Sequence, residues 1–230
     1  MHIILDLGHG MNDTTKGKSS PLLDPKEFNL RDVTVYQNRF REGNFNRLIG
    51  QRLERMLKDA GFEVHTVSDN YNDTPLKERV KKANEIAKKY GKENCIYVSI
   101  HSNAASNGID WNNASGTSVH CCRKCSEASK KLARLIYKYV LEKGYNGNRA
   151  IPQDHIWYND FFVLRNTKMP AVLVENLFYD NKSDLKKLMS DEHRDVIVSY
   201  LYHGILEYMV EENYIKKCWI ILHKFIYYYI

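Results

Sequence analysis

The sequence has little of what marks a disulfide-stabilised scaffold, a disordered chain or a fibrous protein. Only five prolines and five cysteines occur among 230 residues, and the formal charge is +6. The low proline content and the 43% share of hydrophobic residues exclude a disordered or fibrous chain. An odd number of cysteines, three of them bunched at Cys121, Cys122 and Cys125, excludes a disulfide framework and indicates synthesis in a reducing compartment. A chain of this length can form one sizeable domain with its own core.

Neither end of the sequence carries a recognisable targeting or membrane-spanning segment. The N-terminus has no basic region followed by a long apolar run, so we expect no secretory signal. The apolar and aromatic run Cys218–Ile230 has 13 residues, whereas a spanning helix needs about 20. We therefore expect a domain over residues 1–212 and a tail over 213–230. The tail would be an added strand or packed segment, a contact with a membrane surface or partner, or an accident of the sequence end.

The positive charge is spread along the chain rather than concentrated. No basic run is interleaved with aromatic residues, so we expect no nucleic-acid partner. The sequence does not indicate an oligomeric state.

Short apolar runs alternate with longer helical patterns. The expected strands are His2–Asp6, Phe62–Val67, Cys95–Ile100, Thr117–Cys122, Phe161–Leu164 and Ala171–Val174. The expected helices are Glu42–Ala60, Leu76–Tyr90, Ser126–Lys143 and Asp191–Glu211. Strands separated by helices require right-handed crossovers. The pattern therefore predicts a single α/β domain with a mostly parallel, mixed and twisted sheet of about six strands and helices on both faces.

Two polar stretches are too long to be simple connections. They are Gly10–Arg41 and Ala104–Gly116. Loops of this length are usually functional or mobile. We expect the first stretch to be a lid or a substrate-binding loop, with an inhibitory element as the alternative.

Four chemically reactive side chains are expected at one edge of the sheet. His9 follows the first strand between two glycines, and His101 follows the third strand. Glu42 opens the first helix, and Glu175 closes the apolar strand that begins at Ala171. In open α/β sheets the ligand site lies outside the carboxyl ends of the strands. These four groups should therefore converge there.

Two imidazoles and one carboxylate form a typical catalytic zinc set, with a fourth position left for water. Glu175 would then be the acid or base that moves protons, because a buried carboxyl has a raised pKa. Each residue alone has an ordinary alternative role: His9 as a turn residue, Glu42 as a helix-start acid, and Glu175 as a member of a buried ion pair. The joint pattern favours a metal site with one zinc ion.

The sequence resembles the zinc-dependent N-acetylmuramoyl-L-alanine amidases of the amidase-3 type. These are cell-wall hydrolases of bacteria and their phages. The resemblance covers about Met1–Met209. It rests on the following segments, in order: Leu5–Gly10, Glu42–Asn46, Glu78–Val80 with Ala83-Asn84, Ser99–Asn103 and Phe162–Glu175.

The resemblance implies that His9, Glu42 and His101 hold zinc and that Glu175 is the catalytic residue. It also implies cleavage of the amide between N-acetylmuramic acid and L-alanine in peptidoglycan. A zinc peptidase or amidohydrolase acting on soluble peptides, or a non-catalytic cell-wall-binding module, are the alternatives. Without a signal peptide, a wall hydrolase would be made in the cytoplasm and act on the cell wall, as a phage or prophage lysin released by a holin does.

Substrate binding and one departure from the family pattern give further expectations. Asn103 and Arg165 are candidates to bind substrate, although Asn103 can equally cap its own loop and Arg165 can be an ion-pair partner. The family usually has glycine where this chain has Asn176, so the backbone after Glu175 is expected to turn differently.

The remaining cysteine and histidine clusters give weaker signals. Cys121 and Cys122 are adjacent in a strand and face opposite sides, so buried free thiols are expected rather than a second zinc site. His120, Asp154 and His155 lie near the expected edge, where ordinary surface roles are favoured over substrate binding. His193 and His203 have no metal-binding spacing.

Overall fold

The computed structural model describes residues 1–11, 13, 17–106 and 108–215. Its strands are β1 (His2–Leu7), β2 (Val35–Tyr36), β3 (Arg39–Phe40), β4 (Glu63–Thr66), β5 (Cys95–Asn103), β6 (Ser118–Cys121), β7 (Trp157–Tyr158) and β8 (Ala171–Phe178). Its helices are α1 (Glu42–Asp59), α2 (Leu76–Tyr90), the 3-10 turn η1 (Lys92–Asn94), α3 (Glu127–Glu142), α4 (Phe162–Asn166), α5 (Lys182–Leu188) and α6 (Asp191–Glu211).

Six strands form the central sheet in the order β4-β1-β5-β8-β6-β7. The first four of these run parallel, β6 runs antiparallel to β8, and β7 runs parallel to β6. The central strands are buried on both faces, which explains why their sequences are almost continuously apolar. The expected mixed α/β sheet of six strands is confirmed.

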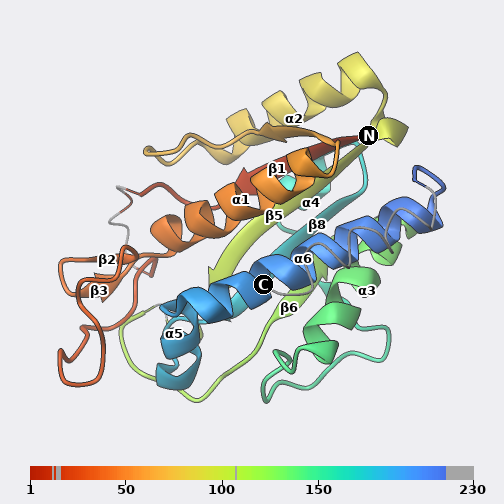
Figure 1. Ribbon diagram of the computed structural model, residues 1–230. Coiled ribbons are helices and arrows are strands. Elements are labelled where there is room, and N and C mark those ends of the chain that lie inside the picture. The colour runs from red at the N-terminus through yellow and green to blue at the C-terminus, as the bar shows by residue number, and fades with distance from the viewer. Residues whose placement is uncertain (12, 14–16, 107, 216–230) are drawn as a thin grey trace.

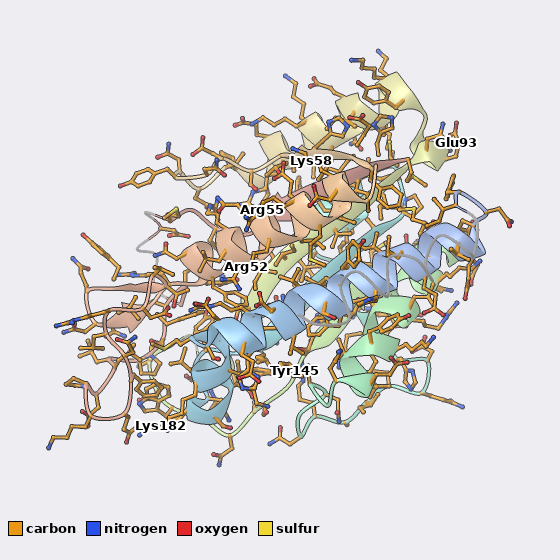
Figure 2. The ribbon with its side chains drawn as sticks, viewed as in Figure 1. Arg52, Arg55, Lys58, Glu93, Tyr145 and Lys182 are labelled. Atoms are coloured by element: carbon orange, nitrogen blue, oxygen red, sulfur yellow. The ribbon has the colours of Figure 1, made fainter. Side chains whose placement is uncertain are left out.

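Helices cover both faces of the sheet (Figure 1). On one face, α1, α3 and α6 pack against alternate strand residues such as Ile3, Leu5 and Leu7. On the other face, α2 and α4 pack against the residues between them, such as Ile4. Side chains alternate with period two along a strand, so each strand contributes to both cores. Arg52 of α1 also pairs with two aspartates of α6 on the outer surface (Figure 2).

One expected strand is wrong. The run Phe161–Leu164 was expected to be extended, but Phe162–Asn166 forms helix α4. The Asn166 amide and the Thr167 hydroxyl donate hydrogen bonds back to carbonyls one turn earlier, which stabilises the helical turn. A short apolar run cannot be assigned to strand or helix by periodicity alone. The sixth strand of the sheet is instead the two-residue β7, and α5 was also not expected.

The two long polar stretches are packed together where the structure describes them. Phe28 of the first stretch stacks on Trp111 of the second, with ring centroids 5.7 Å apart and an interplanar angle of 4°. The ammonium of Lys182, at the start of α5, lies 5.6 Å from the centroid of the Trp111 ring. The first stretch also contains the β2–β3 hairpin. Its described part is therefore anchored to the domain rather than a bare connection.

The C-terminal tail lies almost wholly outside the described residues, because the structure describes the chain only to residue 215. The expected strand-like or packed state of residues 216–230 therefore stays a prediction. Among the described helices, none combines the length and the apolar character that a membrane span requires.

Candidate functional site

The four expected reactive residues meet at the carboxyl edge of the parallel strands. His9 lies just after β1, Glu42 is the first residue of α1, His101 is in β5 and Glu175 is in β8. His101 and Glu175 are direct partners in the β5–β8 register. Neighbouring strands lie roughly 4.8 Å apart, and paired residues project to the same face. The sheet therefore fixes Glu175 beside His101.

His9, Glu42 and His101 form a compact set of candidate metal ligands. One Glu42 oxygen lies 2.9 Å from His101 Nδ1, and the other lies 3.5 Å from His9 Nε2. One donor atom from each residue can be chosen so that all three lie within 4.8 Å of one another. Two imidazole nitrogens and one carboxylate oxygen are donors that zinc prefers, with room for a fourth ligand. The residues present therefore fit one zinc ion.

Two glycines make this convergence possible. A Cβ atom added to Gly8 would lie 2.1 Å from the His101 ring, and one added to Gly43 would lie 2.1 Å from the Gly10 carbonyl oxygen. No real Cβ can approach so closely, so each site needs glycine. The glycine residues of the two motifs thus let β5 and α1 approach the loop that carries His9.

Polar side chains of α1 form hydrogen bonds with the loop that carries His9. The Asn46 amide and the Arg47 guanidinium both donate to the Gly8 carbonyl, each at 3.0 Å. Arg47 is 2% exposed and donates further hydrogen bonds to the carbonyls of Gly43, Asp69 and Asn70. Sequence reasoning did not single out Arg47. Helical spacing gives no signal for it, because Arg47 lies on the side of α1 opposite the apolar stripe that contains Phe45, Ile49 and Leu53.

The electrostatics of the set favour an ionised Glu42. Burial raises the pKa of Glu42, but His9 and His101 outweigh it and lower that pKa to about 2. Burial also lowers the pKa of His101, but the hydrogen bond and charge of Glu42 raise it above the ordinary value. Burial lowers the pKa of His9. The set thus keeps a negative charge between two imidazoles, as a cation site requires.

Glu175 has the opposite character. Burial raises its pKa to about 7, against the opposing influence of His101. Its Oε2 atom is buried and has no hydrogen-bond partner. A carboxyl with a pKa near neutrality and one unused oxygen is suited to taking up and releasing a proton.

The residue after Glu175 supports the site through the backbone. The Asn176 amide donates to the His101 carbonyl at 2.7 Å and accepts a hydrogen bond from the Tyr200 hydroxyl at 2.5 Å. Leu177 then has a φ of 55°, and the β5–β8 register shifts between His101 and Asn103. Asn176 thus links β8 to β5 at His101. The backbone departs from regular β structure immediately after Asn176.

A cation that sequence reasoning missed lies beside Glu175. The charges of His101, Lys18 and Arg149 all lower the pKa of Glu175. Arg149 Nη1 also donates to Ser118, the residue opposite Glu175 in the β6–β8 register. Arg149 precedes β7 in an irregular segment and carries no motif of its own. The pairing of β6 with β8 and contacts with the Trp157 and Phe178 rings bring it to the site.

The two expected substrate-binding residues are separated by the structure. Asn103 ends β5 at the site edge, and its side-chain oxygen accepts a hydrogen bond from the Ala104 amide at 2.8 Å, so it caps its own loop. Arg165 lies in α4, before the start of β8, and lines a cavity with Lys92 and Pro170. The structure therefore does not bring Arg165 together with Glu175.

His120 is buried rather than on the surface, and burial lowers its pKa to about 4. It contacts Ser118 and Asn159 within the protein.

The cysteines that the structure describes are free thiols, with Cys95, Cys121 and Cys122 buried.

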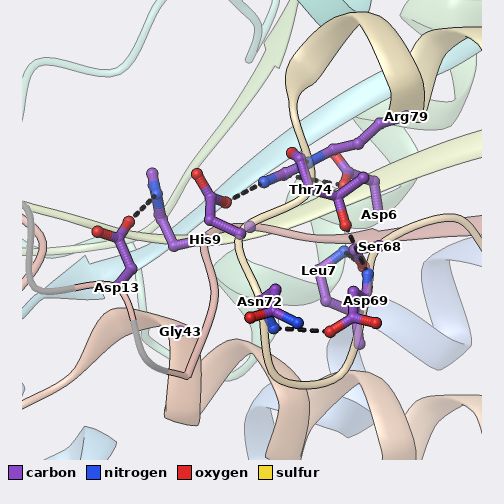
Figure 3. A network of polar contacts seen from close by, with 12 residues as sticks. Asp6, Leu7, His9, Asp13, Gly43, Ser68, Asp69, Asn72, Thr74 and Arg79 are labelled. Atoms are coloured by element: carbon purple, nitrogen blue, oxygen red, sulfur yellow. Dashed lines mark hydrogen bonds and ion pairs between the residues drawn. The ribbon is translucent and has the colours of Figure 1, made fainter.

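A second polar network lies next to the site and involves Asp6 of β1. Its carboxylate accepts hydrogen bonds from Arg79 at 3.1 Å, Tyr97 at 2.7 Å and Ser99 at 2.8 Å. Figure 3 shows this region together with the contact of His9 and Asp13 at 3.2 Å. His9, Asp13 and Asp73 also form a second trio of possible metal ligands, although Asp73 is exposed.

Comparison with known proteins agrees with the fold and the site. The family model described as N-acetylmuramoyl-L-alanine amidase matches residues 3–207. The chain is 25% identical over 206 residues to a probable cell wall amidase, LytH, of Staphylococcus epidermidis, covering 90% of this chain and 57% of that protein. It is 31% identical over 205 residues to the endolysin of Bacillus phage SPP1, covering 88% of this chain and 64% of the endolysin. The chain thus spans about 57 to 64% of the length of these relatives.

Solved structures give the same result. The N-acetylmuramoyl-L-alanine amidase of Clostridium difficile 630 superimposes with a TM-score of 0.68 at 25% identity, over 90% of this chain and 96% of that one. The catalytic domain of the amidase CwlV from Bacillus (Paenibacillus) polymyxa gives a TM-score of 0.67 at 26% identity, over 90% and 97%. The family model covers most of the sequence and includes all four converging residues. The chain therefore belongs to the N-acetylmuramoyl-L-alanine amidase family.

Proposed function

We propose that this chain hydrolyses the amide bond between the lactyl group of N-acetylmuramic acid and the L-alanine of the stem peptide in peptidoglycan. One zinc ion would be held by His9, Glu42 and His101. The observation that carries the proposal is Glu175, whose pKa is about 7 and whose buried Oε2 is unpartnered, fixed by strand register beside the ligand His101.

Two of the three ligand residues, Glu42 and His9, already favour the protonation state that binds a metal. Glu42 is ionised at neutral pH because its pKa is about 2, and His9 has a lowered pKa that favours the neutral, coordinating imidazole. When bound, zinc would supply Lewis acidity that polarises the amide carbonyl and makes a coordinated water more acidic.

Glu175 would manage the protons of the reaction. Its ionised carboxylate removes a proton from the attacking water at Oε2, and the same atom then donates that proton to the amine of the departing L-alanine. A group of pKa about 7 can perform both steps near neutral pH because both of its protonation states are populated.

The cell wall is the proposed place of action, and release as a phage or prophage lysin is the proposed route. The phage endolysin among the relatives supports this route. The excess of positive charge, +6, suits an anionic wall.

The test is to incubate purified chain with peptidoglycan and to measure newly formed L-alanine amino groups. We expect release that a chelator abolishes and added zinc restores. The Glu42→Gln variant should lose bound zinc, measured by elemental analysis, and lose activity with it. Release that survives chelation, or cleavage confined to soluble peptides, would contradict the proposal.

A further inference from the structure

Arg149 lies at the end of a row of functional groups along the sheet edge. The strand order β1-β5-β8-β6-β7 places His9 first, His101 next and Glu175 third. Arg149 comes after them, joined through Nη1 to Ser118 of β6 at 2.9 Å. The metal ligands and Arg149 are therefore on opposite sides of Glu175.

The guanidinium of Arg149 is held in place by aromatic rings. Its central carbon lies 5.4 Å from the Trp157 ring centroid and 5.5 Å from that of Phe178. Cation–π contacts with the two rings and the bond to Ser118 restrain its orientation. A group fixed in this way loses little conformational freedom when a ligand binds.

The donors of Arg149 are largely unused within the protein. The guanidinium has five N–H donors, and the structure shows one hydrogen bond from it and no ion pair with a carboxylate among the described residues. By contrast, Arg79 donates to two aspartates and a backbone carbonyl. Near Arg149, the Tyr137 hydroxyl is buried without a hydrogen-bond partner, and its ring meets Trp157 edge-on at 5.0 Å. The free guanidinium donors of Arg149 therefore indicate a place for an anionic ligand.

We propose that Arg149 binds a carboxylate of the stem peptide and so sets the specificity of the site for the peptide portion of the substrate. This inference rests on the proposed function. Glu175 gives its proton to the departing amine, so the peptide lies on the Glu175 side of the bond, towards Arg149. The acetylated sugars of the glycan are neutral, whereas the stem peptide carries carboxylates. A planar guanidinium with parallel donors matches a carboxylate in a bidentate geometry.

The experiment uses two synthetic muramoyl dipeptides that differ only at the second residue, which has either a free carboxylate or a carboxamide. Binding is measured by calorimetry on the full chain with zinc, in a Glu175→Gln background that prevents turnover. We expect the carboxylate ligand to bind roughly tenfold more tightly than the carboxamide. Adding Arg149→Gln should remove this preference. Arg149→Lys keeps the charge but not the paired donors, so it should leave an intermediate preference.

Arg123→Gln is the matched control, because Arg123 is exposed and pairs with Asp160 beyond the opposite end of β6. It should leave the preference unchanged. Equal binding of the two ligands, or a preference that survives both Arg149 variants, would overturn the inference. If the chain with intact Glu175 hydrolyses neither ligand nor peptidoglycan, the proposed function fails. An Arg149-dependent preference measured by binding would still support the carboxylate site.

Discussion

Asp6 and Glu175 are carboxyl groups on strands that flank β5, and their environments lead to opposite chemistry. Asp6 is 0% exposed and accepts hydrogen bonds from Arg79, Tyr97 and Ser99. Burial raises its pKa, but the charges of Arg79 and His101 and the hydrogen bonds from the two hydroxyls outweigh burial, so the pKa falls below the ordinary value. Glu175 has no donor at its buried Oε2, and burial raises its pKa to about 7.

Burial alone therefore does not decide whether the pKa of a carboxyl group rises or falls. Hydrogen bonds and an ion pair stabilise the charged form of a buried carboxylate, and these contacts also stabilise the fold. One that lacks donors is held close to neutrality, where it can exchange a proton. Replacing either carboxyl group, or one of the donors to Asp6, tests this difference.

The largest expected effect follows from removing the exchangeable proton at Glu175. Glu175→Gln should lower peptidoglycan hydrolysis by about 10²- to 10⁴-fold, the usual contribution of general acid–base catalysis. Zinc content and unfolding temperature should stay unchanged, because the amide has nearly the same shape and Glu175 is not a ligand. Turnover within a few-fold of the unmodified chain would show that Glu175 has no proton-transfer role.

Removing the main donor to Asp6 should affect stability rather than the chemical step. Arg79→Gln leaves a buried carboxylate without its ion-pair partner, which costs about 3–5 kcal/mol in free energy of unfolding. Urea denaturation measures this loss. Arg55→Gln on the outer surface of α1 serves as the control and should change stability by less than about 0.5 kcal/mol. A loss below about 1 kcal/mol for Arg79→Gln would show that Asp6 does not depend on this partner.

The stabilising contribution of ionised Asp6 should vanish in acid. Its folded pKa lies below the ordinary value of 3.8, so the contribution is complete above that value and is lost as pH falls through the folded pKa. The difference in unfolding free energy between the unmodified chain and Asp6→Asn should therefore stay constant from pH 7 to about 5 and narrow below 3.8. Denaturation of both proteins across this range provides the measurement. A difference that grows in acid has the wrong sign for this assignment.

The smallest effect comes from removing one of the neutral donors. Ser99→Ala should cost about 1 kcal/mol, since Arg79 and Tyr97 still hold the Asp6 carboxylate. Thermal or urea denaturation can resolve this change, and activity should remain, because Ser99 does not touch Glu175 or the metal ligands. A loss as large as that of Arg79→Gln would mean that the three donors are equivalent.

The sequence was sufficient to predict most of the fold. Long amphipathic helices and buried parallel strands have strong apolar patterns, and the rule for ligand sites in α/β sheets then located His9, Glu42, His101 and Glu175 at one edge. Short elements were not predictable in this way. The short apolar run at Phe161 is compatible with a strand or a helix. Packing with α2 and the hydrogen bonds of Asn166 and Thr167 stabilise it as helix α4.

The sequence by itself determined which groups could form a zinc site, because strand endings and glycine positions are local features. Only the tertiary structure decided the pKa of each carboxyl group and which cations lie near it. Arg79 and Arg149 come from segments remote from their carboxyl partners, and neither contact follows from spacing. The pKa of a buried group depends on donors and charges gathered from the whole fold, so chemically identical carboxyl groups acquire different roles.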